Sequence, residues 1–312
     1  MSTIQGRATR DAYGEAILEL GRDDSRIYVI DCDIGRSCKT VEFARQLPQQ
    51  HINVGIAEQN ACGVAAGLAT CGKIPFVTTY AVFGSMRMLE QIRQEVCYPE
   101  LNVKIACSHG GLTPANDGAS HQGIEDMGLL RTLANMTVVA PADFASTKAL
   151  VKAAAAYDGP VYLRFTRDAV PFIYDDQDEF EIGKAVLHSE GTDITIISTG
   201  AVLGLCRRAA AQLEEWSISV RLLDMHTIKP IDREAVLASI AATKGIITVE
   251  DHTIINGLGS AVAEIVSEFG TVRMRRIGVQ DQFGESAPYE RLLEKNGITV
   301  DGIVGAAHEL LG

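Results

Sequence analysis

Short apolar runs alternate with longer amphipathic stretches along the whole chain, and this alternation limits the possible folds more than any other feature. In the first half, runs rich in β-branched residues predict strands at residues 27–31, 74–79, 103–107, 137–140 and 161–165. Apolar residues at helical spacing fall between them, at residues 57–70, 86–97, 124–133 and 144–157. Such alternation is typical of a parallel sheet covered by helices on both faces.

The same alternation restarts in the second half of the chain. It predicts strands at residues 194–198, 220–225, 245–249 and 272–279, and helices at 204–216, 233–243, 260–269 and 289–295. The sequence therefore predicts an α/β fold with two doubly wound domains and largely parallel sheets.

An acidic segment at residues 168–183 separates the two halves and has no repeating apolar face, which marks a linker. A chain of 312 residues is long enough for two domains with separate cores. We expect a first domain at residues 1–170, a linker at 171–188 and a second domain at 189–312.

Charge and composition argue against several classes of partner. The formal net charge is −12, which disfavours a nucleic acid or an anionic membrane surface. No segment has the roughly 18 apolar residues of a membrane span. The first residues lack the apolar core of a signal peptide, so we expect a cytoplasmic protein. Its 7 cysteines include no Cys-x-x-Cys pair, which predicts reduced thiols and no metal site on this chain.

Ligands of open parallel sheets bind beyond the carboxyl ends of the strands, so chemistry is expected in the loops at residues 31–40, 80–85 and 107–122. The last of these loops contains His109, Asp117 and His121, which supply groups that titrate near neutral pH. A metal site is the rival interpretation. The spacing favours substrate contact, because the two histidines do not form the close helical pair typical of zinc enzymes.

Glu58 lies at the start of a predicted helix of small and apolar residues, within the sequence Gly-Ile-Ala-Glu-Gln-Asn. An acid in the first turn of a helix often serves only to favour the helix dipole. The residues that follow indicate that this helix is buried together with its carboxylate. A buried carboxylate can share a proton with a ring nitrogen of a ligand, so Glu58 is a candidate catalytic residue.

The segment around Glu58, together with the run at residues 75–83, resembles the pyrimidine-binding domain of transketolases and deoxyxylulose-phosphate synthases. The resemblance implies an enzyme that uses thiamine diphosphate. In that family the glutamate hydrogen-bonds the aminopyrimidine ring and promotes formation of the reactive ylid, and the cofactor performs the carbanion chemistry. The resemblance gives the role of that glutamate to Glu58.

The histidine loop matches the same family in residue types and spacing. The resemblance implies that His109 contacts the sugar phosphate, that Asp117 contacts a substrate hydroxyl, and that His121 lies near the carbonyl where charge develops. Three other side chains, those of Arg10, Ser37 and Arg167, each have an ordinary explanation as a surface charge or a turn former. The resemblance assigns the substrate phosphate to a set of four, namely Arg10, Ser37, His109 and Arg167.

Tyr80 and Phe83 occupy positions from which family members place aromatic rings beside the aminopyrimidine. Without the family they are an ordinary pair of core aromatic residues at the end of a strand. Met86 stands where a third aromatic residue is common in the family.

The second half of the chain, on residues 228–232 and 249–260, resembles the C-terminal domain that follows in this family. The family's diphosphate and Mg²⁺ site is normally marked by Gly-Asp-Gly and a later Asn, and this sequence contains no such motif. We therefore expect a split enzyme, in which an N-terminal transketolase subunit holds the diphosphate and Mg²⁺. Family active sites lie between subunits, which implies a homodimer or an α2β2 assembly.

The resemblance implies a transketolase subunit that transfers a two-carbon ketol unit from a ketose phosphate to an aldose. Two alternatives stay open at this point. One is the β subunit of a 2-oxo acid dehydrogenase E1 component, which shares the layout of the two domains. The other is a regulatory homologue without catalysis, against which the joint presence of Glu58, Asp117 and His121 argues.

Overall fold

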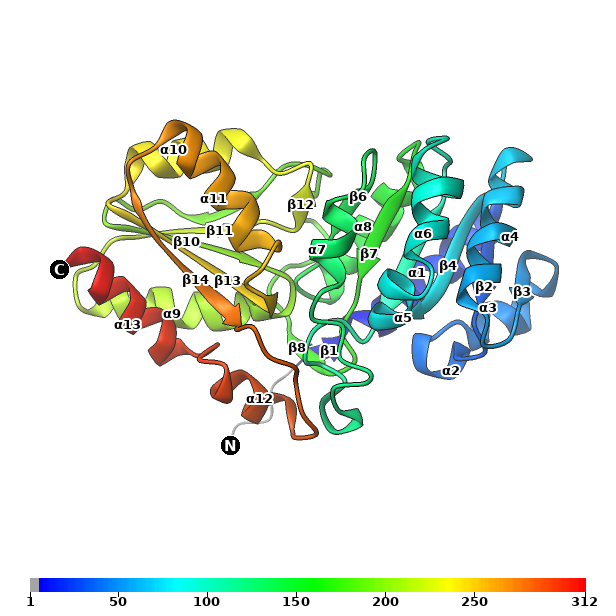
Figure 1. Cartoon of the computed structure of the whole chain (residues 1–312), viewed down its shortest axis with the longest axis horizontal. Helices are drawn as coiled ribbons and strands as arrows, with labels where there is room; N and C mark the ends of the chain where they lie inside the picture. The colour runs from blue at the N-terminus through cyan, green and yellow to red at the C-terminus, as the bar shows by residue number, and fades with distance from the viewer. Residues whose placement is uncertain (1–5) are drawn as a thin grey trace.

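The computed structural model describes residues 6–312 and places them in two lobes, each built around an open sheet (Figure 1). The first lobe has a seven-stranded sheet with the strand order β12-β6-β7-β5-β4-β2-β3. All of its strands are parallel except β12, which is antiparallel to β6. Their bounds are β2 (Ile27–Asp31), β3 (His51–Asn53), β4 (Ile74–Tyr80), β5 (Lys104–Ser108), β6 (Thr137–Val139), β7 (Val161–Arg164) and β12 (Thr227–Lys229).

Helices cover both faces of this sheet because successive strand residues point to opposite sides. Val29 packs in one core cluster with α1 (Thr9–Asp23), α3 (Val41–Gln46) and α8 (Phe144–Ala156). The next residue, Ile30, belongs to the cluster on the opposite face. That face is covered by α4 (Glu58–Thr70), α5 (Ala81–Met86), α6 (Leu89–Gln91), a π-helical turn (Ile92–Cys97) and α7 (Asp126–Arg131).

The second lobe repeats this plan with a five-stranded sheet in the order β14-β13-β10-β11-β9, in which only β9 is antiparallel. Its strands are β9 (Val186–Ser189), β10 (Ile194–Thr199), β11 (Val220–Asp224), β13 (Gly245–Thr253) and β14 (Arg273–Val279). Helices α9 (Leu203–Glu215) and α13 (Val300–Leu311) cover one face, and α10 (Arg233–Ala242) and α11 (Leu258–Phe269) cover the other. The short helix α12 (Tyr289–Lys295) follows the last strand.

One strand crosses from the second lobe into the first sheet. Strand β12 follows β11 of the second lobe but pairs with β6 of the first sheet. Strand β8 (Ala169–Pro171), which leads out of the first lobe, pairs with β1 (Gly6–Ala8) at the start of the described chain. The lobes are therefore joined by backbone hydrogen bonds as well as by the connecting chain.

The α/β fold with two doubly wound, largely parallel sheets is confirmed. Several elements differ in detail from the sequence-based expectation. Residues 81–85, expected in a loop, belong to helix α5, and β13 continues through residues 250–253 beyond its expected end. Helix α13 and strand β12 were not expected at all. In each case the segment makes long-range contacts that local periodicity does not report.

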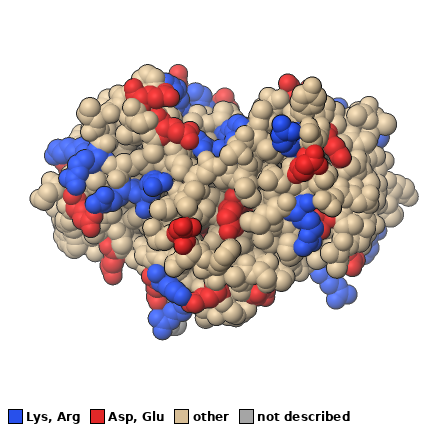
Figure 2. All heavy atoms as spheres, in the orientation of Figure 1, with Lys and Arg blue, Asp and Glu red and all other residues tan. Residues whose placement is uncertain are grey.

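Within residues 6–312, every helix is too short or too polar to cross a lipid bilayer. On the face shown in Figure 2, acidic and basic side chains are interspersed, and neither sign forms a continuous stripe.

Candidate active site

The residues singled out in the sequence come together at the carboxyl edge of the first sheet. Strand β2 leads into the short helix α2 (Gly35–Cys38), β3 leads to Glu58 at the start of α4, and β4 ends at Tyr80. The histidine loop follows β5, and Arg167 follows β7. This edge is where open parallel sheets bind ligands, since the strand order reverses between β2 and β4.

Glu58 is the first residue of α4, and only 2% of its surface is exposed. Its Oε2 atom accepts a hydrogen bond of 2.8 Å from Nη1 of Arg87, a residue that the sequence did not single out. The Arg87 guanidinium in turn lies 4.5 Å from the ring centroid of Phe83. No hydrogen bond from within residues 6–312 reaches the other oxygen, Oε1. The carboxylate is therefore held in place by one oxygen, while the second accepts no hydrogen bond from residues 6–312.

The aromatic residues and the two histidines form one cluster of rings. The ring of Tyr80 stacks on that of His109 at 3.8 Å between centroids and lies 5.9 Å from that of Phe83. His121 packs its edge against Phe83 at 5.6 Å and against Tyr80 at 6.0 Å. The sequence placed the aromatic residues beside a cofactor and the histidines beside a substrate, whereas the structure brings all four rings into contact.

His109 is buried, and its backbone has a φ of +63°, a conformation that non-glycine residues seldom adopt. Burial, together with the positive charges of Arg10 and Arg167, lowers the pKa of His109 to about 3, so the imidazole is neutral at neutral pH. Its Nδ1 atom lies 2.8 Å from Oγ of Ser108, which lies 3.3 Å from Sγ of Cys38.

The tautomer of His109 is linked to the direction of the two hydrogen bonds behind it. Burial raises the pKa of Cys38 to about 12, so the thiol keeps its proton and can donate to Ser108. The Ser108 hydroxyl can then donate to Nδ1 of His109. This order of donors leaves the His109 proton on Nε2, as a hydrogen-bond donor for a ligand.

The remaining members of the predicted phosphate set lie around His109. Nη1 of Arg10 donates to the backbone carbonyl of Ser37 at 3.0 Å, and Nε of Arg10 is buried without a partner among residues 6–312. Nη1 of Arg167 lies 3.2 Å from Oδ2 of Asp117 and donates to the Pro114 carbonyl at 2.5 Å. The family resemblance implies separate roles for Asp117 and Arg167, but the structure joins them in an ion pair. Such a pair orients the guanidinium and limits its motion.

Comparison with known proteins gives the same family along nearly the whole chain. Residues 5–172 match the family "Transketolase, pyrimidine binding domain", and residues 183–303 match "Transketolase, C-terminal domain". A putative transketolase C-terminal section from Methanocaldococcus jannaschii is 43% identical over 95% of this chain and 94% of its own length. A 6-deoxy-6-sulfo-D-fructose transketolase subunit from a Clostridium species is 42% identical over 96% of this chain and 94% of its own length.

A solved structure of similar length shows the same fold. It is described as a split gene transketolase, inactive beta4 tetramer, and it superposes with a TM-score of 0.90 at 47% identity over 98% of both chains. Since the relatives at this level of identity have the length of this chain, the match is to separate transketolase subunits. The chain therefore belongs to the transketolase family, whose members use thiamine diphosphate, and it has the domain make-up of the C-terminal subunit of a split enzyme.

Proposed function

We propose that this subunit works in a split transketolase that transfers a two-carbon ketol unit from a ketose phosphate to an aldose acceptor. The observation that carries the proposal is the arrangement at the carboxyl edge of the first sheet. There the buried Glu58 carboxylate and the cationic surroundings of His109 are connected by one cluster of aromatic rings. A site of this kind can hold a heteroaromatic ring at one end and an anionic group at the other.

The residues around Glu58 fit the aminopyrimidine ring of thiamine diphosphate. A carboxylate oxygen without a partner in the described part of the chain suits a ring nitrogen that carries a proton, and the Tyr80 and Phe83 rings supply apolar faces. Arg87 holds the Glu58 carboxylate in place through its other oxygen. When bound, thiamine diphosphate supplies the carbanion chemistry of the reaction.

The phosphate of the substrate would lie among Arg10, Ser37, His109 and Arg167. The buried Nε of Arg10 lacks a partner in the described chain, and a phosphate oxygen would satisfy it. The neutral His109 would donate from Nε2, as its contact with Ser108 allows. An overall acidic protein can bind an anion here because local groups, not the net charge, set the potential in a pocket.

His121 and Asp117 are the proposed contacts for the reacting part of the sugar. His121 is only partly buried and lies against Phe83, so its imidazole can exchange protons with a bound substrate. Asp117 is held by Arg167, which fixes its carboxylate as an acceptor for a substrate hydroxyl.

The diphosphate and Mg²⁺ would be held by a companion N-terminal subunit, because this sequence contains no Gly-Asp-Gly motif with a later Asn. Ile56, two residues before Glu58, is 75% exposed, and Met86, next to Arg87, is 41% exposed, which suits a surface covered by another subunit. The related split transketolase that was solved as an inactive β4 tetramer supports this division of labour. We propose an assembly in which two copies of this chain join two companions, as an α2β2 complex.

Substrate choice tests the proposal. In the complex with its companion, the wild-type chain should transfer a two-carbon unit from a ketose phosphate and should not decarboxylate a 2-oxo acid. Arg10→Met should raise the KM for the ketose phosphate by about 10- to 100-fold, since it removes a charged hydrogen bond, and Arg45→Met should not. Turnover of a 2-oxo acid without ketol transfer would identify the chain as a dehydrogenase subunit instead.

A further inference from the structure

The histidine loop is anchored in the second lobe, although it belongs to the first. Leu112, near the start of the loop, and Ile124, just after its end, are both buried in the core cluster of the second lobe. That cluster also contains Ile247 and Val249 of strand β13. The segment that carries His109 and His121 is therefore packed at both ends against the second sheet.

Asp251 of β13 makes the central polar contact with this loop. It is 2% exposed, its Oδ1 accepts a 3.0 Å hydrogen bond from the backbone N–H of Leu112, and its Oδ2 accepts one of 3.0 Å from the Tyr289 hydroxyl. Gly111, with a φ of +63°, passes so close that a Cβ atom there would lie 2.4 Å from Oδ2 of Asp251. The contact therefore requires glycine at this point of the loop.

Further hydrogen bonds hold the far side of the loop and its base. Nε2 of Gln122 donates to the backbone carbonyl of Glu285 at 2.9 Å, and Oγ of Ser286 donates to the carbonyl of Asn116 at 2.5 Å. Nη2 of Arg164 donates both to the carbonyl of Asp251 at 2.8 Å and to that of Gly123 at 3.0 Å. The second lobe thus contacts the loop between its two histidines and after the second one.

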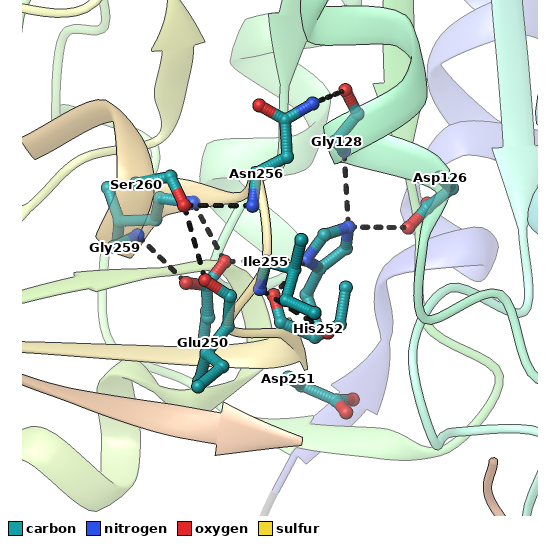
Figure 3. Close-up of polar contacts among 12 residues, drawn as sticks. Asp126, Gly128, Glu250, Asp251, His252, Ile255, Asn256, Gly259 and Ser260 are labelled. Atoms are coloured by element: carbon teal, nitrogen blue, oxygen red, sulfur yellow. Dashed lines mark hydrogen bonds and ion pairs between the residues drawn. The ribbon is translucent and has the colours of Figure 1, made fainter. Parts of the chain in front are cut away.

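The neighbours of Asp251 on the strand face other partners, as Figure 3 shows. Nε2 of His252 accepts a 3.1 Å hydrogen bond from the N–H of Gly128. Glu250 accepts hydrogen bonds from the first N–H groups of α11, at residues 258 and 259. Asp251 points away from both, so within this run of three residues it alone serves the histidine loop.

We propose that Asp251 is a positioning residue for the transferase site, through which the second lobe fixes the conformation of the histidine loop. The inference rests on the proposed function of that loop. Asp251 touches neither histidine and acts through Leu112 and the backbone that leads back to His109. Displacement of a catalytic group by about 1 Å can lower the rate by about 100-fold. Loss of the backbone anchor at Leu112 could displace His109 by this amount, and this is sufficient to control catalysis.

The test compares two aspartates of the second lobe in the complex with the companion subunit. Asp224, at the end of β11, is equally buried and accepts a 2.8 Å hydrogen bond from a tyrosine, Tyr174, but it does not contact the loop. Asp251→Ala should lower kcat/KM for the ketose phosphate by about 100-fold, and Asp224→Ala should change it less than about threefold. Both variants should lose thermal stability. Asp251→Asn keeps an acceptor for Leu112 and should restore kcat/KM to near the wild-type value.

Amide hydrogen exchange in the uncomplexed chain gives a readout that does not depend on turnover. Asp251→Ala should speed exchange across residues 109–123, and Asp224→Ala should leave it slow there. If Asp251→Ala does not fold, Tyr289→Phe, which removes the bond to Oδ2, should speed the same exchange more weakly. Unchanged exchange and unchanged kcat/KM in Asp251→Ala would overturn the proposal. A wild-type complex that exchanges slowly but transfers no ketol unit would instead overturn the proposed function.

Discussion

The carboxyl edges of the two largely parallel sheets differ in how their polar side chains are bonded. At the carboxyl edge of the first sheet, Oε1 of Glu58 and the buried Nε of Arg10 have no partner among residues 6–312, and His121 is partly open to solvent. At the carboxyl edge of the second sheet, both oxygens of Asp251 and both ring nitrogens of His252 are bonded within the chain, and both residues are buried.

The difference shows how one fold can supply a binding edge and a supporting edge. Buried polar groups are usually bonded, so donors and acceptors that lack a partner mark the edge that takes a ligand. At the end of β13 the polar groups of the second sheet satisfy one another, which suits a structural role, whereas Oδ1 of Asp224 and Nε2 of His226, at the end of β11 and just after it, are buried without a partner among residues 6–312. Here Asp251, at the carboxyl edge of the second sheet, holds the histidine loop of the first lobe through the backbone of Leu112.

The largest expected effect is on the first edge. Glu58→Gln should lower kcat of the reconstituted complex by about 1000-fold or more, because glutamine cannot exchange a proton with the cofactor ring. The free energy of unfolding should change by less than about 1 kcal/mol, since the lost ion pair is with the half-exposed Arg87. Steady-state kinetics and denaturant unfolding measure the two quantities. Substantial remaining activity would remove Glu58 from this role.

A smaller effect, on stability alone, is expected at the second edge. Burial raises the pKa of Asp224 to about 7, so the folded state binds a proton that the unfolded state releases above about pH 4. The contribution of Asp224 to stability should therefore fall as the pH rises from about 4 to 7. Asp224→Asn should remove this loss and be more stable at pH 8 by on the order of 3 kcal/mol, with no gain below pH 4.

Unfolding in urea at a series of pH values measures that difference. Activity of the Asp224→Asn complex at neutral pH should stay near that of the wild type, because this residue contacts the connecting segment through Tyr174 and not the site. A stability gain that is the same at pH 4 and pH 8 would show that the Asp224 proton is not its source.

The sequence was most informative where local patterns are strong. The alternation of apolar residues located most strands of both sheets, including β2 and β4, within a residue or two, but it did not predict the short edge strands β3 and β9. It missed helix α5, because that helix is only 6 residues long and follows β4 directly. It also missed the pairing of β12 with the first sheet, since a three-residue strand that crosses between lobes has no local signature.

For the candidate site, the motifs identified residues but not their contacts. The position of Arg10 near Ser37 agrees with the expectation, although the contact is to the backbone carbonyl of Ser37. Arg87 carried no signal, because an arginine within a helical pattern resembles any surface charge. Asp251 was equally hidden, since its partner Leu112 lies 139 residues away along the chain. Such long-range contacts are decided by tertiary packing and cannot be inferred from spacing.

Division of the active site between two chains is tested most directly by activity with and without the companion. The purified chain, supplied with thiamine diphosphate and Mg²⁺, should transfer no two-carbon unit. Addition of a companion subunit that carries Gly-Asp-Gly and the downstream Asn should restore transfer and saturate at equal concentrations of the two chains. Full transfer by the isolated chain would contradict the division of the site.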